Sequence, residues 1–159
     1  MRDRTFGVLF RRGAGKMASA EQLIDAMDRD GVDVSVVLGY GWCDRDTAYE
    51  SNDYLLDAME RFPERLIAYC SVHPGWGDEA LIEIERCVKA GARGIGELHP
   101  ASQQIDLATD EALGPMMALS IERALPVLVH GSEAVGHAYA GKGTTTPDQL
   151  LAFSQRFPD

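Results

Sequence analysis

Four short apolar runs divide the chain, and turn-forming or charged residues bound each of them. The runs span residues 34–38, 66–72, 93–98 and 126–130. They are rich in Val, Ile and Leu and lack the regular polar alternation of a strand with one wet face. This pattern predicts four strands buried on both faces of a parallel sheet.

Helical periodicity fills the segments between these runs. Ser19 followed by Gln22 is typical of a capping box, and Thr146-Pro147 combines an N-cap with a proline at the first helical position. Apolar residues at helical spacing predict further helices over residues 52–61, over residues 81–88, and after Thr109, which we expect to cap its helix.

The strands begin about every thirty residues and a helix separates each from the next, which is the rhythm of a βα fold. Parallel strands need such crossovers, and the crossovers wind right-handed. Two architectures fit this rhythm: a doubly wound open sheet, and part of a (β/α)8 barrel. Periodicity alone does not distinguish them, and the length of 159 residues predicts a single domain.

The composition of the chain argues against some classes of binding partner. The chain carries 25 acidic and 15 basic residues, a formal charge of −10 that repels phosphate backbones, so we expect no nucleic-acid partner. No apolar run is long enough to cross a bilayer and the first residues lack a signal-peptide pattern, so we expect no membrane partner and a cytoplasmic location. Three cysteines without paired spacings favour neither a disulfide framework nor a cysteine zinc cluster.

The chemistry-bearing residues gather after the predicted strands. All four histidines lie at or beyond the C-terminal end of a strand: His73, His99, His130 and His137. Glu97 precedes the second of them. In both candidate architectures this edge of the sheet is where active sites are built. Histidine and carboxylate there are typical ligands of a divalent ion such as zinc, which lowers the pKa of a bound water.

Each residue also has a structural interpretation. His73-Pro74 is typical of a turn in which the imidazole binds backbone, and His99-Pro100 suits that interpretation as well as function. His130 ends a wholly apolar strand, which favours a functional role. Glu97 is similar, because an unpaired carboxylate at a buried strand end is unfavourable. His137, in a loop, could be simply solvated.

One segment is close to a phosphate-binding loop. Residues 136–142 fit the pattern G-x-x-x-x-G-K, but Gly143 stands where such a loop has Ser or Thr. The first glycine also follows the strand by six residues, and no helix is predicted to begin at Lys142. Nucleotide or phosphate binding through this segment therefore stays a minor alternative.

Several ordered segments resemble one known family. They include residues 26–33, 52–54, 61–66, 94–100, 125–130 and 157–159. They resemble the amidohydrolase-related metal-dependent hydrolases of the amidohydrolase 2 type, the branch that includes aminocarboxymuconate-semialdehyde decarboxylase. The resemblance implies an α/β chain that is a partial (β/α)8 TIM barrel, roughly strands 2 to 5 of the parent with their helices.

The resemblance also implies roles for individual residues. The family has a mononuclear centre, usually zinc, and its strand-five histidine matches His130, which is the expected metal ligand. Glu97 and His99 would face the same pocket as catalytic residues. The loop after strand five would cover the substrate, with Lys142 meeting an anionic group. His137 and Trp42 are further substrate-binding candidates.

The family pattern is incomplete in this sequence. No His-x-His pair occurs, and the strand-six histidine and strand-eight aspartate of the family have no counterpart before Asp159. We therefore expect residues 1–159 to be a single incomplete barrel domain, truncated at both ends, that binds zinc weakly by itself. Its outer strands would be open edges able to pair with a second copy.

Function is expected at two levels. The intact parent is expected to be a metal-dependent enzyme that hydrolyses C–N or C–O bonds of a small, anionic molecule, or that decarboxylates it. The alternatives for this chain are a non-catalytic remnant or interaction module and, less favoured, a phosphate- or nucleotide-binding α/β domain using residues 136–142.

Overall fold

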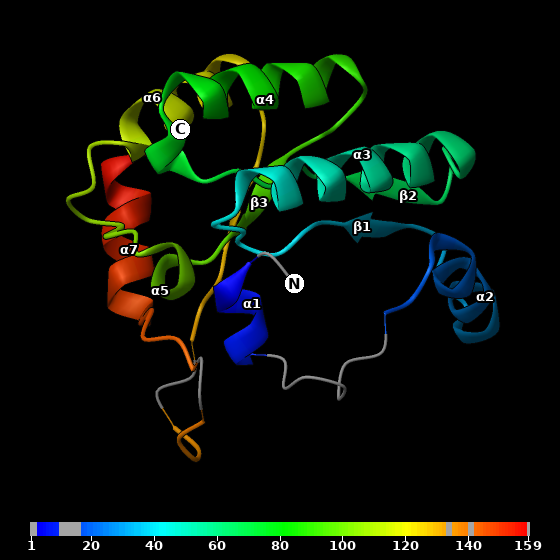
Figure 1. Cartoon of the computed structure of the whole chain (residues 1–159), viewed down its shortest axis with the longest axis horizontal. Coiled ribbons are helices and arrows are strands. Elements are labelled where there is room, and N and C mark those ends of the chain that lie inside the picture. Colours follow the sequence, from blue (N-terminus) through cyan, green and yellow to red (C-terminus); the bar gives the residue numbers. More distant parts are fainter. Residues whose placement is uncertain (1–2, 10–16, 133–134, 140–141, 159) are drawn as a thin grey trace.

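The computed structural model describes residues 3–9, 17–132, 135–139 and 142–158 (Figure 1). Its elements are, in chain order, α1 (Arg4–Leu9), α2 (Ala20–Asp30), β1 (Ser35–Val37), α3 (Arg45–Arg61), β2 (Leu66–Ala68), the 3₁₀ turn η1 (Pro74–Trp76), α4 (Asp78–Lys89), β3 (Ile95–Leu98), α5 (Pro100–Gln103), α6 (Leu113–Glu122), β4 (Val127–Val129) and α7 (Pro147–Arg156). Each predicted apolar run therefore contains a strand. Among the described residues, no helix combines the length and the apolar character needed to cross a membrane.

The four strands lie side by side in sequence order. β1 is parallel to β2, with Ser35 opposite Leu66, and β3 is parallel to β4, with Ile95 opposite Val127. A parallel bridge between Cys70 and Ile95 joins the two pairs. A doubly wound sheet reverses its strand order at a switch point, whereas consecutive neighbours are the order of a (β/α)8 barrel. The order thus favours the barrel architecture.

Two apolar clusters hold the helices on the strands. In the larger, β3 packs against α4 and α6, which lie together at the top of Figure 1. Its fully buried members, with no exposed surface, are Ile84, Cys87, Ile95, Leu98 and Leu113. In the smaller, α2 and α3 cover β2. Because β3 is buried in the larger cluster, its C-terminal end is held in a fixed position in the fold.

Helix ends follow the capping pattern at two of the predicted positions. Ser19 and Gln22 form both hydrogen bonds of a capping box at α2. Thr146 forms the same box at α7, with Pro147 as the first helical residue. At both helices the cap satisfies N–H groups that would otherwise lack a partner.

Two helix starts differ from the prediction. α3 begins at Arg45, seven residues before Asn52, because the Asp44 carboxylate accepts the backbone N–H of Thr47 at 2.8 Å and acts as the N-cap. The expected cap at Thr109 is wrong: α6 begins only at Leu113. Thr109 lies instead in a turn where its N–H donates to the Asp106 carboxylate at 3.3 Å.

A buried polar network ties α3 to the strand ends. The Asn52 side chain donates to the Ser71 carbonyl at 3.1 Å and to Glu83 Oε1 at 2.8 Å, and it accepts the Ser71 N–H at 2.8 Å. Ser71 Oγ then donates to the carbonyl of Gly96, the residue before Glu97. The network therefore connects a helix on the outside of the sheet with the C-terminal end of β3.

Glu83 is the charged member of this network, and its side chain is 1% exposed. Arg86 donates to both of its carboxylate oxygens, at 2.7 and 2.8 Å. Burial by itself would raise the pKa of Glu83, but the hydrogen bonds from Arg86 and Asn52 outweigh burial and leave that pKa below its usual value. The carboxylate is therefore held in its charged form.

Candidate functional site

Three of the predicted site residues meet where β3 and β4 end. Glu97 belongs to β3, His99 follows it, and His130 follows β4. His130 Nδ1 lies 2.7 Å from Glu97 Oε1, and the rings of His99 and His130 stack with centroids 4.1 Å apart and planes inclined by 10°. The parallel pairing of β3 with β4 brings these residues together, since it places both C-terminal ends at one edge.

The three side chains differ in how much of their surface is exposed to solvent. His130 and Glu97 retain 32% and 21% of their exposed surface, so both reach solvent at the strand ends. His99 retains 1% and forms the wall behind His130. A solute that enters this edge therefore meets the Glu97–His130 pair first.

Backbone and side-chain hydrogen bonds fix the His99 ring. Its N–H donates to Gln103 Oε1 at 2.8 Å, and its Nδ1 accepts the N–H of Ser102 at 3.3 Å, which makes His99 the N-cap of α5. Tyr40 forms a hydroxyl–hydroxyl hydrogen bond with Ser102 and contacts the His99 ring at 5.1 Å. Burial, and then the neighbouring His130, lower the pKa of His99.

Trp42 lies in an aromatic cluster beside this wall. Its ring lies 5.5 Å from that of Tyr40 and 5.1 Å from that of Phe6, a residue of α1. The indole Nε1 is buried and has no hydrogen-bond partner among the described residues. A buried N–H without an acceptor is unfavourable by about 1–3 kcal/mol, so an acceptor atom from a ligand would be stabilised there.

Two glycines let the loop after β1 approach the site. A side chain at Gly41 would place Cβ 2.4 Å from the Cβ of His99. One at Gly39 would place Cβ 2.6 Å from Ser71 Oγ and 2.8 Å from Trp42 Nε1. Because real Cβ atoms do not make such contacts, only glycine fits at these positions.

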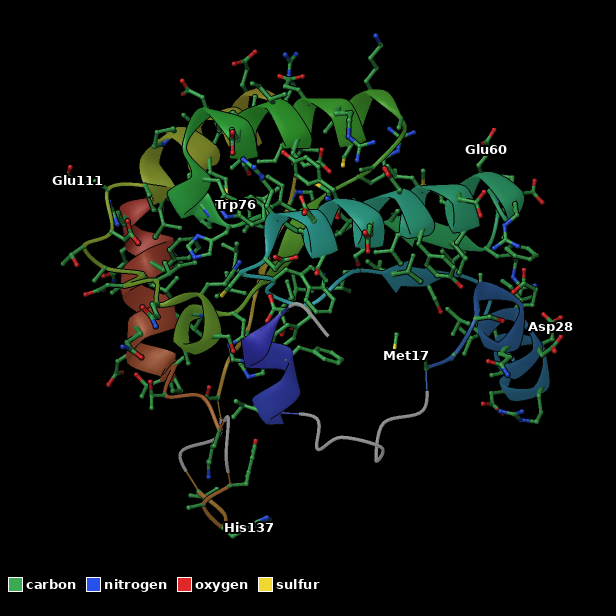
Figure 2. The ribbon with its side chains drawn as sticks, viewed as in Figure 1. Met17, Asp28, Glu60, Trp76, Glu111 and His137 are labelled. Carbon is green, nitrogen blue, oxygen red and sulfur yellow. The ribbon has the colours of Figure 1, made fainter. Side chains whose placement is uncertain are left out.

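The loop between β4 and α7 carries the other two predicted residues away from the stack. Figure 2 shows His137 at the far end of this loop. Lys142 Nζ donates to the carbonyls of Val135 at 2.7 Å and His137 at 3.5 Å. Among the described residues, neither His137 nor Lys142 has a hydrogen bond or ring contact with Glu97, His99 or His130.

The described part of this loop differs from a phosphate-binding loop. α7 begins at Pro147, five residues after Lys142, and the lysine ammonium binds carbonyls of its own loop. In a true phosphate loop the lysine opens a helix. Residues 140 and 141 of the pattern lie outside the described residues.

His73 has the structural role that its sequence context suggested. It is the N-cap of η1, and its Nδ1 accepts the Gly75 N–H at 3.0 Å. The ring also has a hydrogen bond with the backbone of Gln103, as expected for a turn histidine that binds backbone. Burial lowers the pKa of His73, and this hydrogen bond offsets only part of the effect. The ring contacts Trp76 with centroids 5.9 Å apart and takes no part in the His99–His130 stack.

The sequence profile of the amidohydrolase family matches residues 11–159. The chain belongs to the amidohydrolase family. The resemblance seen in the ordered segments is thereby confirmed. A comparison with curated proteins gives no match.

Solved structures of larger amidohydrolase-like enzymes share the fold. The 5-carboxyvanillate decarboxylase of Novosphingobium aromaticivorans, solved with manganese and 3-methoxy-4-hydroxy-5-nitrobenzoic acid, is 22% identical with a TM-score of 0.67, over 93% of this chain and 45% of that one. The 4-oxalomesaconate hydratase of Rhodopseudomonas palustris is 19% identical with a TM-score of 0.56, over 80% of this chain and 45% of that one. The predicted partial TIM barrel is confirmed, and this chain spans less than half the length of either enzyme.

The strand-end cluster presents one imidazole nitrogen that could bind a divalent ion. A carboxylate that accepts Nδ1–H leaves the His130 Nε2 lone pair free, and metal-ligating histidines are held in this way by an outer carboxylate. Among the described residues, no three His, Cys, Asp or Glu side chains lie close enough to hold an ion together. The pair would therefore supply one metal ligand, His130, and one residue that orients it, Glu97.

Several residues that hold this site in place are not evident from the sequence pattern. Asn52 had a usable signal: it lies three and four residues before Leu55 and Leu56, on the apolar face of its helix, where a polar side chain needs a partner. Tyr40 and Gln103 had none, because their contacts to the neighbourhood of His99 join residues far apart or in a short turn.

Proposed function

We propose that this chain forms part of the active site of a metal-dependent amidohydrolase-type enzyme, with His130 as a metal ligand through Nε2. The 2.7 Å hydrogen bond between His130 and Glu97 at the strand ends carries this proposal. The reaction would be hydrolysis of a C–N or C–O bond, or decarboxylation, of a small anionic molecule. The decarboxylase and hydratase with this fold support the enzyme class.

Glu97 and His99 hold the ligand ring in two different ways. Glu97, at the edge of the ring, holds the proton of His130 on Nδ1, which keeps the electron pair on Nε2 directed outward. His99 supports one face of the ring by stacking on it. A divalent ion bound there would polarise an oxygen of the substrate or supply an activated water.

Trp42, Lys142 and His137 are the proposed substrate contacts. The unpartnered Trp42 N–H would donate to an oxygen of the substrate. Lys142 and His137 would meet an anionic group from the loop between β4 and α7. The end of that loop supports this role, because a Cβ at Gly143 would lie 3.7 Å from the His130 ring and 2.2 Å from Ser132 Oγ.

The proposed ion is zinc, which suits an imidazole nitrogen with oxygen ligands. The Novosphingobium decarboxylase was solved with manganese, so Mn²⁺ is the second ion to test. Because His130 is the one supported ligand in the described part of the chain, binding to this chain is expected to be weak for either ion.

Calorimetric titration of Zn²⁺ and Mn²⁺ into the chain tests the metal site. His130→Ala should weaken binding at least tenfold, and Glu97→Gln about tenfold, because outer-shell partners typically contribute 10–100-fold. His73→Asn is the matched control, since its ring is fixed in a turn away from the stack. Equal loss from His73→Asn and His130→Ala would contradict the proposal.

A non-catalytic interaction module is the second candidate. The outer strand β1 and the residues before it expose Val32, Val34 and Val36 to 41%, 49% and 44%. Such an apolar edge can pair with another strand. A chain that binds no divalent ion but forms a defined assembly would favour this candidate over the enzyme.

A further inference from the structure

His99 and His130 present their rings face to face, and this arrangement constrains which of them can bind an ion. The centroids are 4.1 Å apart and the planes are inclined by 10°. An imidazole nitrogen binds a metal with a lone pair that lies in the ring plane, at about 2.0–2.1 Å for zinc. An ion shared by both rings would have to lie near both planes.

Two planes at this separation and inclination meet far from either ring. A spacing of 4.1 Å and a tilt of 10° place the line of intersection roughly 20 Å away, about ten times the length of a Zn–N bond. The lone pairs of the two rings therefore run nearly parallel and do not converge. One ion can take a nitrogen from one of these rings, and the other ring has a different role.

Hydrogen bonds at Nδ1 give the two rings opposite tautomers. His130 Nδ1 faces the Glu97 carboxylate and donates its N–H to it in a hydrogen bond, which leaves Nε2 with its lone pair. His99 Nδ1 accepts the Ser102 N–H, so it carries no proton, and the neutral ring must carry its proton on Nε2. His99 is thereby a hydrogen-bond donor at the nitrogen that a metal would need.

We infer that His99 is a positioning residue that holds the ring of His130 by stacking and is itself barred from the metal. The inference rests on the proposed function for the identity of the ligand, His130. The wall behind His99 supports the role: Ser102 and Gln103 fix its ring and backbone, and Tyr40 contacts its face. The ring is fixed before any ion binds.

Substitutions separate a positioning role from a ligand role. His99→Phe keeps a flat ring against His130 but removes both nitrogens, whereas His99→Ala removes the ring. We expect Zn²⁺ affinity within about threefold of wild type in His99→Phe, and weakened about tenfold in His99→Ala. His73→Phe is the matched control, because that ring is locked by the same kind of Nδ1 hydrogen bond. Equal losses in both His99 variants would overturn the inference.

Nitrogen NMR of the histidine rings tests the tautomers without any metal. In the ¹⁵N-labelled chain, His99 and His73 should show a protonated Nε2 and His130 a protonated Nδ1. In Glu97→Leu, only His130 should lose its preference for the tautomer with a protonated Nδ1. On addition of Zn²⁺ the Nε2 of His130 should shift and that of His99 should keep its proton. A protonated Nδ1 in His99, or loss of its Nε2 proton to zinc, would overturn the inference.

The same spectra keep the two proposals distinguishable. If no histidine responds to Zn²⁺ or Mn²⁺, the proposed metal site fails, while the tautomers still show whether the His99 lock exists. If zinc shifts His130 but His99 carries the opposite tautomer, the metal site stands and the positioning role fails.

Discussion

Asn52→Ala tests whether the buried polar network holds the strand ends in place. Asn52 is 1% exposed and its amide makes three hydrogen bonds, two to the backbone of Ser71 and one to Glu83. Alanine would leave the N–H and carbonyl of Ser71 and one carboxylate oxygen of Glu83 each short of a partner. At about 1 kcal/mol for each lost bond, the free energy of unfolding should fall by about 3 kcal/mol.

Urea unfolding followed by circular dichroism measures this loss. Asp57→Asn is the matched control on the same helix, because its ion pair with Arg61 is exposed and contributes at most about 0.5 kcal/mol. The loss should also reach the site, since Ser71 Oγ holds the carbonyl before Glu97. If Asn52→Ala unfolds within about 0.5 kcal/mol of the control, the network does not stabilise the fold as described.

Three other variants test the buried charge of Glu83, the close contact between Gly41 and His99, and the exposed edge at Val36. The pKa of Glu83 is lower in the folded chain than the value of about 4.3 expected in the unfolded chain. The Glu83 carboxylate therefore stabilises the fold at pH values above about 4.3, and this stabilisation is lost as the pH falls through the pKa of the folded chain. Glu83→Gln should flatten the acid limb of a stability–pH curve, and an unchanged limb would refute this. Gly41→Ala should destabilise the chain by about 1–3 kcal/mol, because its Cβ would collide with His99, whereas Gly114→Ala, with open space around it, should not; thermal melts compare them. The open edges predict that the chain associates in a sizing experiment and that Val36→Lys reduces association; a compact monomer at all concentrations would exclude pairing with a second copy.

The positions of the strands along the chain can be predicted from the sequence because their signals are local. Four apolar runs without polar alternation are enough to predict parallel strands, but not their burial on both faces, because Val36 of β1 and Leu128 of β4 are 44% and 38% exposed. Ser19 and Thr146 predict their helices through capping hydrogen bonds that span only four residues. The cap at Asp44 cannot be predicted from apolar periodicity, because the first three residues of α3 are polar: Arg45, Asp46 and Thr47. Thr109 does not cap a helix because it lies in a turn, where its N–H donates to the Asp106 carboxylate.

The candidate site was predictable in position but not in roles. Parallel strands bring their C-terminal ends to one edge, so Glu97, His99 and His130 had to be neighbours once the strands were recognised. Which ring nitrogen carries a proton depends on Ser102 for His99 and on Glu97 for His130, and whether both rings can bind one ion depends on the angle between them. None of these contacts can be obtained from the spacing of residues in the sequence. The contribution of the loop residues Lys142 and His137 stays a prediction.

Anomalous diffraction from crystals of this chain soaked in Zn²⁺ would show directly which histidine binds the ion. We expect a zinc peak about 2.1 Å from His130 Nε2, with Nδ1 still hydrogen-bonded to Glu97 and the His99 ring stacked behind without contact to the ion. A peak shared by His99 and His130, or zinc bound at His73 or His137 with none at His130, would contradict this expectation.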